Sequence, residues 1–137
     1  MLYRKLPHYK YQMLSPYTYE LPKAFAGLSA NTTYLHLENR RLTIRSGYAW
    51  DGPSGPTIDT KTFMRGSLIH DALYQLIAEG YLSTKLRIAA DQILRDVCQD
   101  DGMNPIRATY VYWAVRWFGG FHMQLRNHKR SKVYRLL

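Results

Sequence analysis

The sequence contains one cysteine, Cys98, among 137 residues, so the chain forms no internal disulfide. A single cysteine also excludes the clustered thiolates of a structural zinc site. Its position beside Val97 in a helical pattern predicts a small core residue rather than a nucleophile. The chain has no run of about 18 apolar residues, so no transmembrane helix is expected. The N-terminus lacks the apolar core of a secretory signal, which predicts a chain that is intracellular when made.

Acidic residues are also few. The chain has 10 Asp and Glu against 19 Lys and Arg, which gives a formal net charge of +9. A charge of this sign favours nucleic acid, an anionic membrane surface or an acidic protein as partner, and it equally serves solubility. Residues 121–137 form a basic tail with Arg126, Lys129, Arg130, Lys132 and Arg135. No nucleic-acid recognition motif accompanies this tail, so nucleic acid is the less favoured partner.

The first 50 residues carry mainly β patterns. Two short strands are expected within Tyr9–Leu14 and Tyr17–Leu21, and residues 23–32 are predicted to be a loop. A hairpin with one buried face is predicted around Asn39-Arg40 by the alternation of Leu35, Leu37, Leu42 and Ile44. His36 points away from that face and is interpreted as a solvated strand residue rather than a ligand.

Residues 62–120 carry the 3.6-residue period of helices. Three helices are expected, over about 62–79, 83–101 and 104–119, with Ser83 capping the second, Asn104-Pro105 starting the third and Gly119-Gly120 ending it. The composition, 46% hydrophobic and 21% charged, is that of one globular domain spanning residues 1–137. The predicted fold class is therefore α+β, an N-terminal β hairpin region packed on a three-helix C-terminal half.

A loop and a helix carry the candidate chemistry. The segment Gly47–Pro56 contains three Gly and two Pro, which excludes regular structure over most of it. Its free carbonyls and the carboxylate of Asp51 are hard oxygen ligands of the kind that calcium prefers. Asp51 equally fits a turn in which its side chain caps its own backbone. Both readings of Asp51 stay open from the sequence.

His70 and Tyr74 are four residues apart and share a face of the first helix. Asp71 points about 100° away from His70, so it is free for another role, such as holding a cation. His70 and Asp91 are about equally far from the loop that joins the first two helices, so an antiparallel pair brings them together. The result is either a base with its orienting acid, beside calcium held by Asp51 and Asp71, or a satisfied polar cluster in the core.

One resemblance extends over most of the chain. The segments Trp50–Pro56 and Arg65–Tyr74, with Ala90-Asp91, Asp101-Gly102-Met103 and Val115–Gly119, resemble an uncharacterised family common in tailed phages and prophages. The resemblance covers residues 45–120. It implies a phage origin and a place in the host cytoplasm or the virion, and it implies no settled function.

A second resemblance is to phospholipase A2, especially its small bacterial and fungal forms. It is carried, in order, by Asp51-Gly52-Pro53-Ser54, by His70-Asp71-Ala72-Leu73-Tyr74 and by Asp91. It implies His70 as general base, Asp91 as its orienting acid and Tyr74 as a hydrogen-bond donor to Asp91. It further implies a phospholipase A2-like helical half, and calcium bound by Asp51, Asp71 and the carbonyl of Gly52.

The chain departs from that family in its cysteines. Pro53 stands where the loop cysteine is found, and Leu68 and Ile69 occupy the region of the cysteine before the His-Asp pair. With the enzyme retained, the resemblance implies hydrolysis of an ester in membrane lipid. With only the scaffold retained, it implies a virion or host-takeover protein that binds a protein partner.

Overall fold

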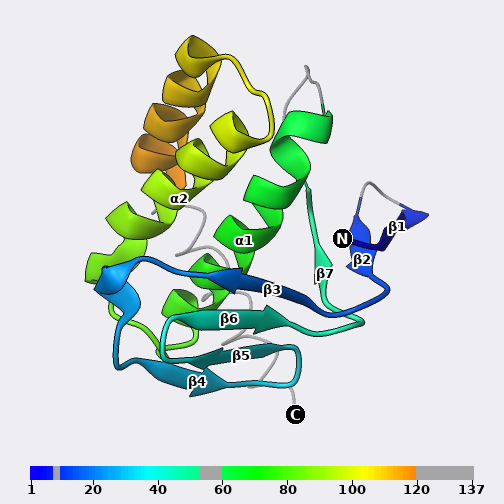
Figure 1. Ribbon diagram of the computed structural model, residues 1–137, viewed down its shortest axis with the longest axis vertical. Helices are drawn as coiled ribbons and strands as arrows, with labels where there is room; N and C mark the ends of the chain where they lie inside the picture. The colour runs from blue at the N-terminus through cyan, green and yellow to red at the C-terminus, as the bar shows by residue number, and fades with distance from the viewer. Residues whose placement is uncertain (8–9, 53–59, 120–137) are drawn as a thin grey trace, which may run out of the picture.

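The structure, a computed structural model, describes residues 1–7, 10–52 and 60–119. Within these ranges, two antiparallel sheets precede three α-helices, so the predicted α+β class is confirmed (Figure 1). The predicted basic tail over residues 121–137 lies outside the described part of the chain.

The larger sheet has four strands in the order β3-β6-β5-β4, and all its neighbours are antiparallel. The strands are β3 (Tyr17–Glu20), β4 (Ser29–Asn31), β5 (Leu35–Glu38) and β6 (Arg41–Ile44). The prediction of a loop over residues 23–32 is wrong, because this segment contains β4 and the 3-10 helix η2 (Lys23–Phe25). Phe25 is fully buried there, and Ala30 is buried opposite Leu37. Two isolated apolar residues are too few to show a period in the sequence.

The β5–β6 hairpin forms as predicted. Asn39 and Arg40 make its turn with φ values of 43° and 70°, the left-handed pair that a two-residue hairpin turn requires. The Arg40 Nε atom donates a hydrogen bond to the carbonyl of Leu21 at 2.8 Å, which ties the turn to the end of β3. His36 is partly exposed, as expected of a solvated strand residue. The opposite face is fully buried through Leu35, Leu37, Leu42 and Ile44.

The smaller sheet has the order β1-β2-β7, formed by β1 (Tyr3–Lys5), β2 (Tyr11–Met13) and β7 (Ala49–Trp50). β7 lies inside the glycine- and proline-rich segment and pairs Trp50 with Tyr11. The indole of Trp50 is buried, and its Nε1 atom donates to Ser67 Oγ on α1 at 3.1 Å. This hydrogen bond holds the end of β7 against the first helix.

The helices are α1 (Thr60–Ala78), α2 (Arg87–Asp100) and a third helix described over residues 105–119. α2 is preceded by the 3-10 turn η3 (Thr84–Leu86), where Ser83 Oγ accepts a hydrogen bond from the Lys85 amide. Asn104 Oδ1 accepts from the Ile106 amide at 2.8 Å and caps the third helix, as predicted. The third helix extends through Gly119, the last described residue, so its predicted stop at Gly119-Gly120 lies at the edge of the described chain.

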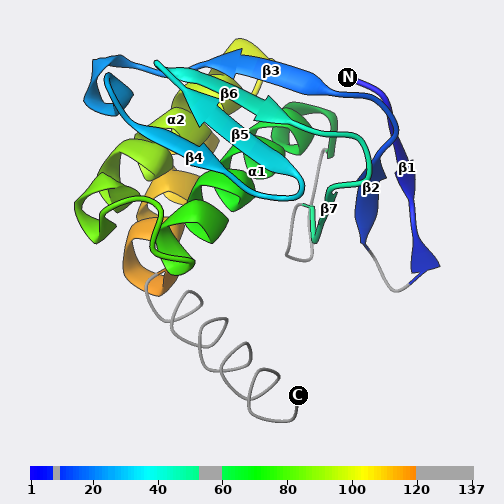
Figure 2. The same ribbon diagram turned by 90° about the horizontal axis from the view of Figure 1, so that it is seen from below.

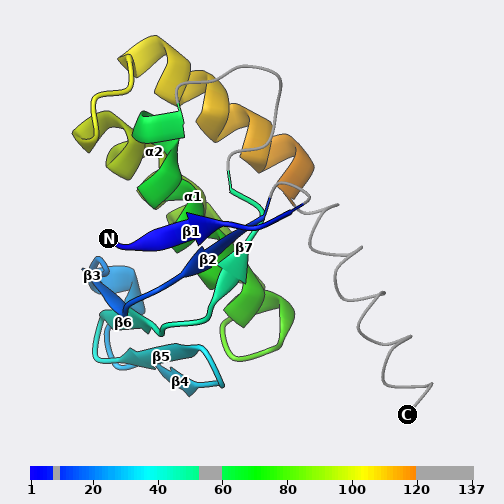
Figure 3. The same cartoon turned by 90° about the vertical axis from the view of Figure 1, so that its right-hand side faces the viewer.

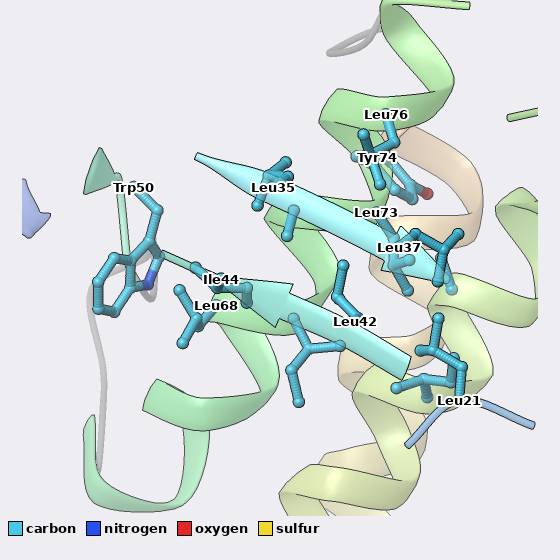
Figure 4. Close-up of a cluster of buried hydrophobic side chains, with 14 of the residues drawn as sticks. Leu21, Leu35, Leu37, Leu42, Ile44, Trp50, Leu68, Leu73, Tyr74 and Leu76 are labelled. Carbon is cyan, nitrogen blue, oxygen red and sulfur yellow. The ribbon is translucent and has the colours of Figure 1, made fainter. Parts of the chain in front are cut away.

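The elements stack in layers. α1 and α2 lie between the four-stranded sheet and the third helix, which is orange in Figure 2 and Figure 3. Figure 4 shows the first apolar cluster, in which side chains of β5 and β6 meet those of α1. A second cluster joins α2 to the third helix through Leu94, Cys98, Met103, Ala108 and Val111.

Cys98 is buried in the second cluster, as the sequence predicted. Burial raises the pKa of its thiol to about 12, because an apolar environment disfavours the thiolate. The side chain therefore serves packing. None of the helices in the described ranges is both long enough and apolar enough to cross a bilayer.

Candidate active site

α1 and α2 bring His70 and Asp91 together. The Nε2 atom of His70 lies 2.7 Å from Oδ1 of Asp91, so the predicted contact between the two helices is present. A carboxylate can only accept at this distance, so Nε2 carries the proton and Nδ1 is the unprotonated nitrogen of the neutral ring. Asp91 is completely buried, with 0% of its surface exposed.

Tyr74 completes this pair from the next turn of α1. Its hydroxyl donates to the same Oδ1 atom of Asp91 at 2.5 Å, and its ring packs against the His70 ring with centroids 4.1 Å apart. Burial and the neighbouring Asp91 carboxylate both raise the pKa of Tyr74, so its hydroxyl stays protonated and remains a donor. The four-residue spacing in the sequence places both side chains on the same oxygen.

Two opposing effects set the protonation of His70. Burial lowers its pKa, but the carboxylates of Asp71 and Asp91 outweigh burial, and the pKa is raised above the ordinary value. Asp71 Oδ1 lies 3.9 Å from Nδ1, on the side of the ring away from Asp91. The imidazole is thus flanked by two acids, one at each nitrogen.

Two arginines that the sequence interpretation missed surround Asp91. Arg116 Nη1, from the third helix, donates to Asp91 Oδ2 at 2.8 Å. Arg87 Nε donates to the Tyr74 hydroxyl at 3.2 Å, and its Nη2 atom donates to the carbonyl of Arg116. The spacing of Arg87 and Asp91, four residues on one helix, was a usable signal. Arg116 had no such signal, because tertiary packing alone brings it to the site.

Gly119 lets the third helix approach this network. A Cβ atom at Gly119 would lie 2.5 Å from the Tyr74 hydroxyl, closer than any side chain could stand. Glycine is therefore the residue that fits between the third helix and Tyr74. In the sequence it was interpreted only as a helix stop.

The three candidate calcium ligands, Asp51, Gly52 and Asp71, lie on two different segments of the chain. Asp71 is beside His70, with 22% of its side chain exposed. Asp51 follows Trp50, which is hydrogen-bonded to Ser67, one helical turn before Asp71. Gly52 has a φ of 75° and packs against the ring of Tyr11, so it also requires glycine.

This placement bears on the fit of calcium. Asp71 offers oxygen ligands beside His70, and the backbone that carries Asp51 and Gly52 is anchored on the same helix. In the described ranges, no group of three or more His, Cys, Asp or Glu side chains is arranged to hold a metal ion. Pro53 and Ser54 lie outside those ranges. Calcium binding stays a prediction.

The comparison with protein families places the chain. A family model described as a protein of unknown function (DUF1353) matches residues 26–115, and the chain belongs to this family. This confirms the predicted membership of an uncharacterised domain family. The match includes His70, Tyr74 and Asp91, whereas Arg116 is the first residue beyond it. No curated protein and no solved structure gives a significant match.

Proposed function

We propose that this protein is a phospholipase A2-like hydrolase that cleaves an ester of membrane lipid. One observation carries the proposal. His70 Nε2 is bound to a buried carboxylate that also receives the Tyr74 hydroxyl, and this leaves Nδ1 as the basic nitrogen. The same residues carry the resemblance to phospholipase A2 in the sequence.

The residues of the site support a simple proton pathway. His70 Nδ1 accepts a proton from water while the water oxygen adds to the ester carbonyl carbon. Asp91 holds the ring in place and stabilises the imidazolium, because its charge lies 2.7 Å from Nε2. When the tetrahedral adduct collapses, the bond to the alcohol oxygen breaks and His70 returns the proton to that oxygen. The products are a fatty acid and the remaining alcohol.

Calcium, if bound, would be held by Asp71, Asp51 and the carbonyl of Gly52. When bound it would polarise the ester carbonyl. The chain's own contribution is the carboxylate of Asp71, which lies on the Nδ1 side of His70 where the water must stand.

The test is release of fatty acid from phospholipid vesicles with and without calcium. We expect calcium-dependent release that His70→Ala abolishes. His36→Ala is the matched control, because His36 is a partly exposed histidine on β5, far in sequence from the site, and its loss should leave the rate unchanged. Release that survives His70→Ala would sink the proposed mechanism.

A second candidate function is non-enzymatic binding of a virion or host protein. It is favoured by the number of donors on Asp91, which joins α1, α2 and the third helix through His70, Tyr74 and Arg116. Such a network also serves as a structural cluster. In that case His70→Ala lowers the melting temperature, calcium has no effect, and wild type releases no fatty acid. The phage origin implied by the resemblance, with a place in the host cytoplasm or virion, suits either function.

A further inference from the structure

The third helix has apolar side chains on two opposite faces. Its inner face is buried on α2 through Ala108 and Val111. Its outer face exposes a row at i, i+4, i+7 and i+11: Ile106 (82% exposed), Tyr110 (75%), Trp113 (50%) and Trp117 (73%). We call this row the aromatic face. A contiguous apolar surface that is exposed in this way marks a site of interaction with a protein or a membrane.

The aromatic face lies on the outside of the molecule. α1 and α2 separate the third helix from the four-stranded sheet (Figure 3), and the exposed fractions of the row show that it faces solvent. Two of its rings pack together, with the centroids of Trp113 and Trp117 6.4 Å apart. Tyr34, Tyr81 and Ile88 are also exposed, on separate segments of the chain, and Met1, Leu2, Tyr3 and Leu14 form a second exposed group at the N-terminal strands. Among the described residues, the third helix carries both exposed tryptophans and the most exposed of these side chains.

The net positive charge of the sequence is concentrated in its last quarter. Residues 105–137 contain seven Lys and Arg and no Asp or Glu, whereas residues 1–104 contain twelve Lys and Arg and ten Asp and Glu. Seven of the nine net positive charges therefore belong to the last quarter of the sequence, which begins with the third helix. A partner of this surface must accept large aromatic groups and carry negative charge.

We infer that the aromatic face docks on an anionic lipid membrane. Trp and Tyr prefer the boundary between acyl chains and headgroups, and a basic sequence in the same chain is attracted to anionic headgroups. The inference names the surface on which the proposed lipid hydrolase would find its substrate, and so it rests on that function for its purpose. A second copy of the chain fits less well, because two chains that each carry a net charge of +9 repel one another.

Binding to vesicles of ether-linked lipids tests the inference, because ether lipids contain no ester to cleave. Diether phosphatidylglycerol provides the anionic surface and diether phosphatidylcholine the neutral one, with cosedimentation as the readout. One variant combines three substitutions on the aromatic face, Ile106→Ala, Tyr110→Ala and Trp117→Ala. The matched control combines three exposed positions elsewhere, Tyr34→Ala, Tyr81→Ala and Ile88→Ala. Melting temperatures confirm that both variants fold.

We expect wild type and control to bind anionic vesicles. The aromatic-face variant should bind more than about tenfold more weakly, because the three truncated side chains can no longer transfer apolar surface from water into the membrane. Binding should weaken with salt and be poor on neutral vesicles. The wild-type chain gives an independent readout. Trp113 and Trp117 are exposed whereas Trp50 is buried, so tryptophan emission should shift to the blue on anionic vesicles.

Several results would overturn the inference. These are equal binding by wild type and the aromatic-face variant, equal binding to neutral and anionic vesicles, or an unshifted emission spectrum. A dimer that the variant dissolves without lipid would assign the face to a second copy. Tighter binding to a single-stranded oligonucleotide than to anionic vesicles would assign it to nucleic acid.

Failure of this inference and failure of the proposed hydrolysis are distinguishable. His70→Ala should bind ether-lipid vesicles as wild type does, whatever its activity. The aromatic-face variant should still hydrolyse a monomeric short-chain phospholipid, because the His70–Asp91 pair is intact. If neither wild type nor the aromatic-face variant hydrolyses the short-chain phospholipid while vesicle binding follows the expected pattern, the membrane-docking surface is supported and the hydrolase proposal is wrong.

Discussion

The α1–α2 layer is covered by the four-stranded sheet on one face and by the third helix on the other, and the two contacts are built differently. The sheet contributes fully buried aliphatic side chains, among them Leu37 and Leu42, to the cluster shown in Figure 4. The third helix contributes a smaller apolar cluster together with the Arg116–Asp91 ion pair and the close approach of Gly119 to Tyr74.

This difference separates the sources of stability from the sources of chemistry. Apolar burial is non-directional and depends mainly on the area removed from water. A buried carboxylate depends on each donor being in place, because an unpaired buried charge is strongly unfavourable. The electrostatics around His70 should therefore respond to changes on the third helix and not to changes in the sheet.

The largest effect is expected from Asp91→Ala. The substitution leaves His70, Tyr74 and Arg116 without their common acceptor, so the free energy of unfolding should fall by about 3–5 kcal/mol and hydrolysis should stop. Urea unfolding measures the first and fatty-acid release the second. Asp96→Ala is the control on the same helix. Its side chain is exposed, and the change in stability should stay within about 0.5 kcal/mol. Comparable losses for both variants would show that the hydrogen bonds of Asp91 contribute no more to stability than an exposed carboxylate does.

A change on the sheet face should affect stability alone. Leu37 is fully buried on β5, so Leu37→Ala should lower the free energy of unfolding by about 2–4 kcal/mol through lost burial and a cavity. The pH dependence of hydrolysis should keep its midpoint, because Leu37 carries no charge and contacts none of the site through a hydrogen bond. A displaced midpoint would show that the sheet also tunes His70.

Gly119→Ala tests the helix face without altering a charge. The added methyl group would lie 2.5 Å from the Tyr74 hydroxyl, so the third helix must shift and stability should fall by about 1–3 kcal/mol. The double variant with Tyr74→Phe removes the oxygen that the methyl group meets. Its total loss should therefore be smaller than the sum of the two single losses. If the losses of the two single variants simply add in the double variant, the added methyl group does not meet the Tyr74 hydroxyl.

The β5–β6 hairpin and the His70–Asp91 contact could be predicted because their signals are local or periodic. Alternating leucines around Asn39-Arg40 define the hairpin, and equal distances from a short loop define facing positions on paired helices. β4 and β7 escaped detection because each contains a single buried residue, and one residue shows no period. They are held by single buried residues, such as Trp50 with its hydrogen bond to Ser67.

The arginine part of the site could not be predicted in the same way. Arg116 lies 25 residues from Asp91, on a helix whose packing angle no local pattern reveals. The exposure of Tyr110, Trp113 and Trp117 was equally hidden, since aromatic residues at helical spacing usually indicate a core. Both follow from one tertiary fact. The third helix turns its small residues, Ala108 and Gly119, toward the other helices.

The smallest effect concerns pH and compares His70 with His36. The pKa of His70 is raised in the folded protein, so proton binding stabilises the fold fully below the ordinary pKa of 6.5, and this stability is lost as pH rises through the folded value. His70→Gln should lower the free energy of unfolding by about 1–3 kcal/mol at acid pH, where a charged hydrogen bond is lost, and by less at alkaline pH. His36→Gln, on the exposed side of β5, should have little effect at either pH. If His70 is the general base, hydrolysis by wild type should increase over the same pH interval in which this difference in stability declines, because both report loss of one proton. Two separate intervals would mean that the histidine that stabilises the fold is not the base that limits the reaction.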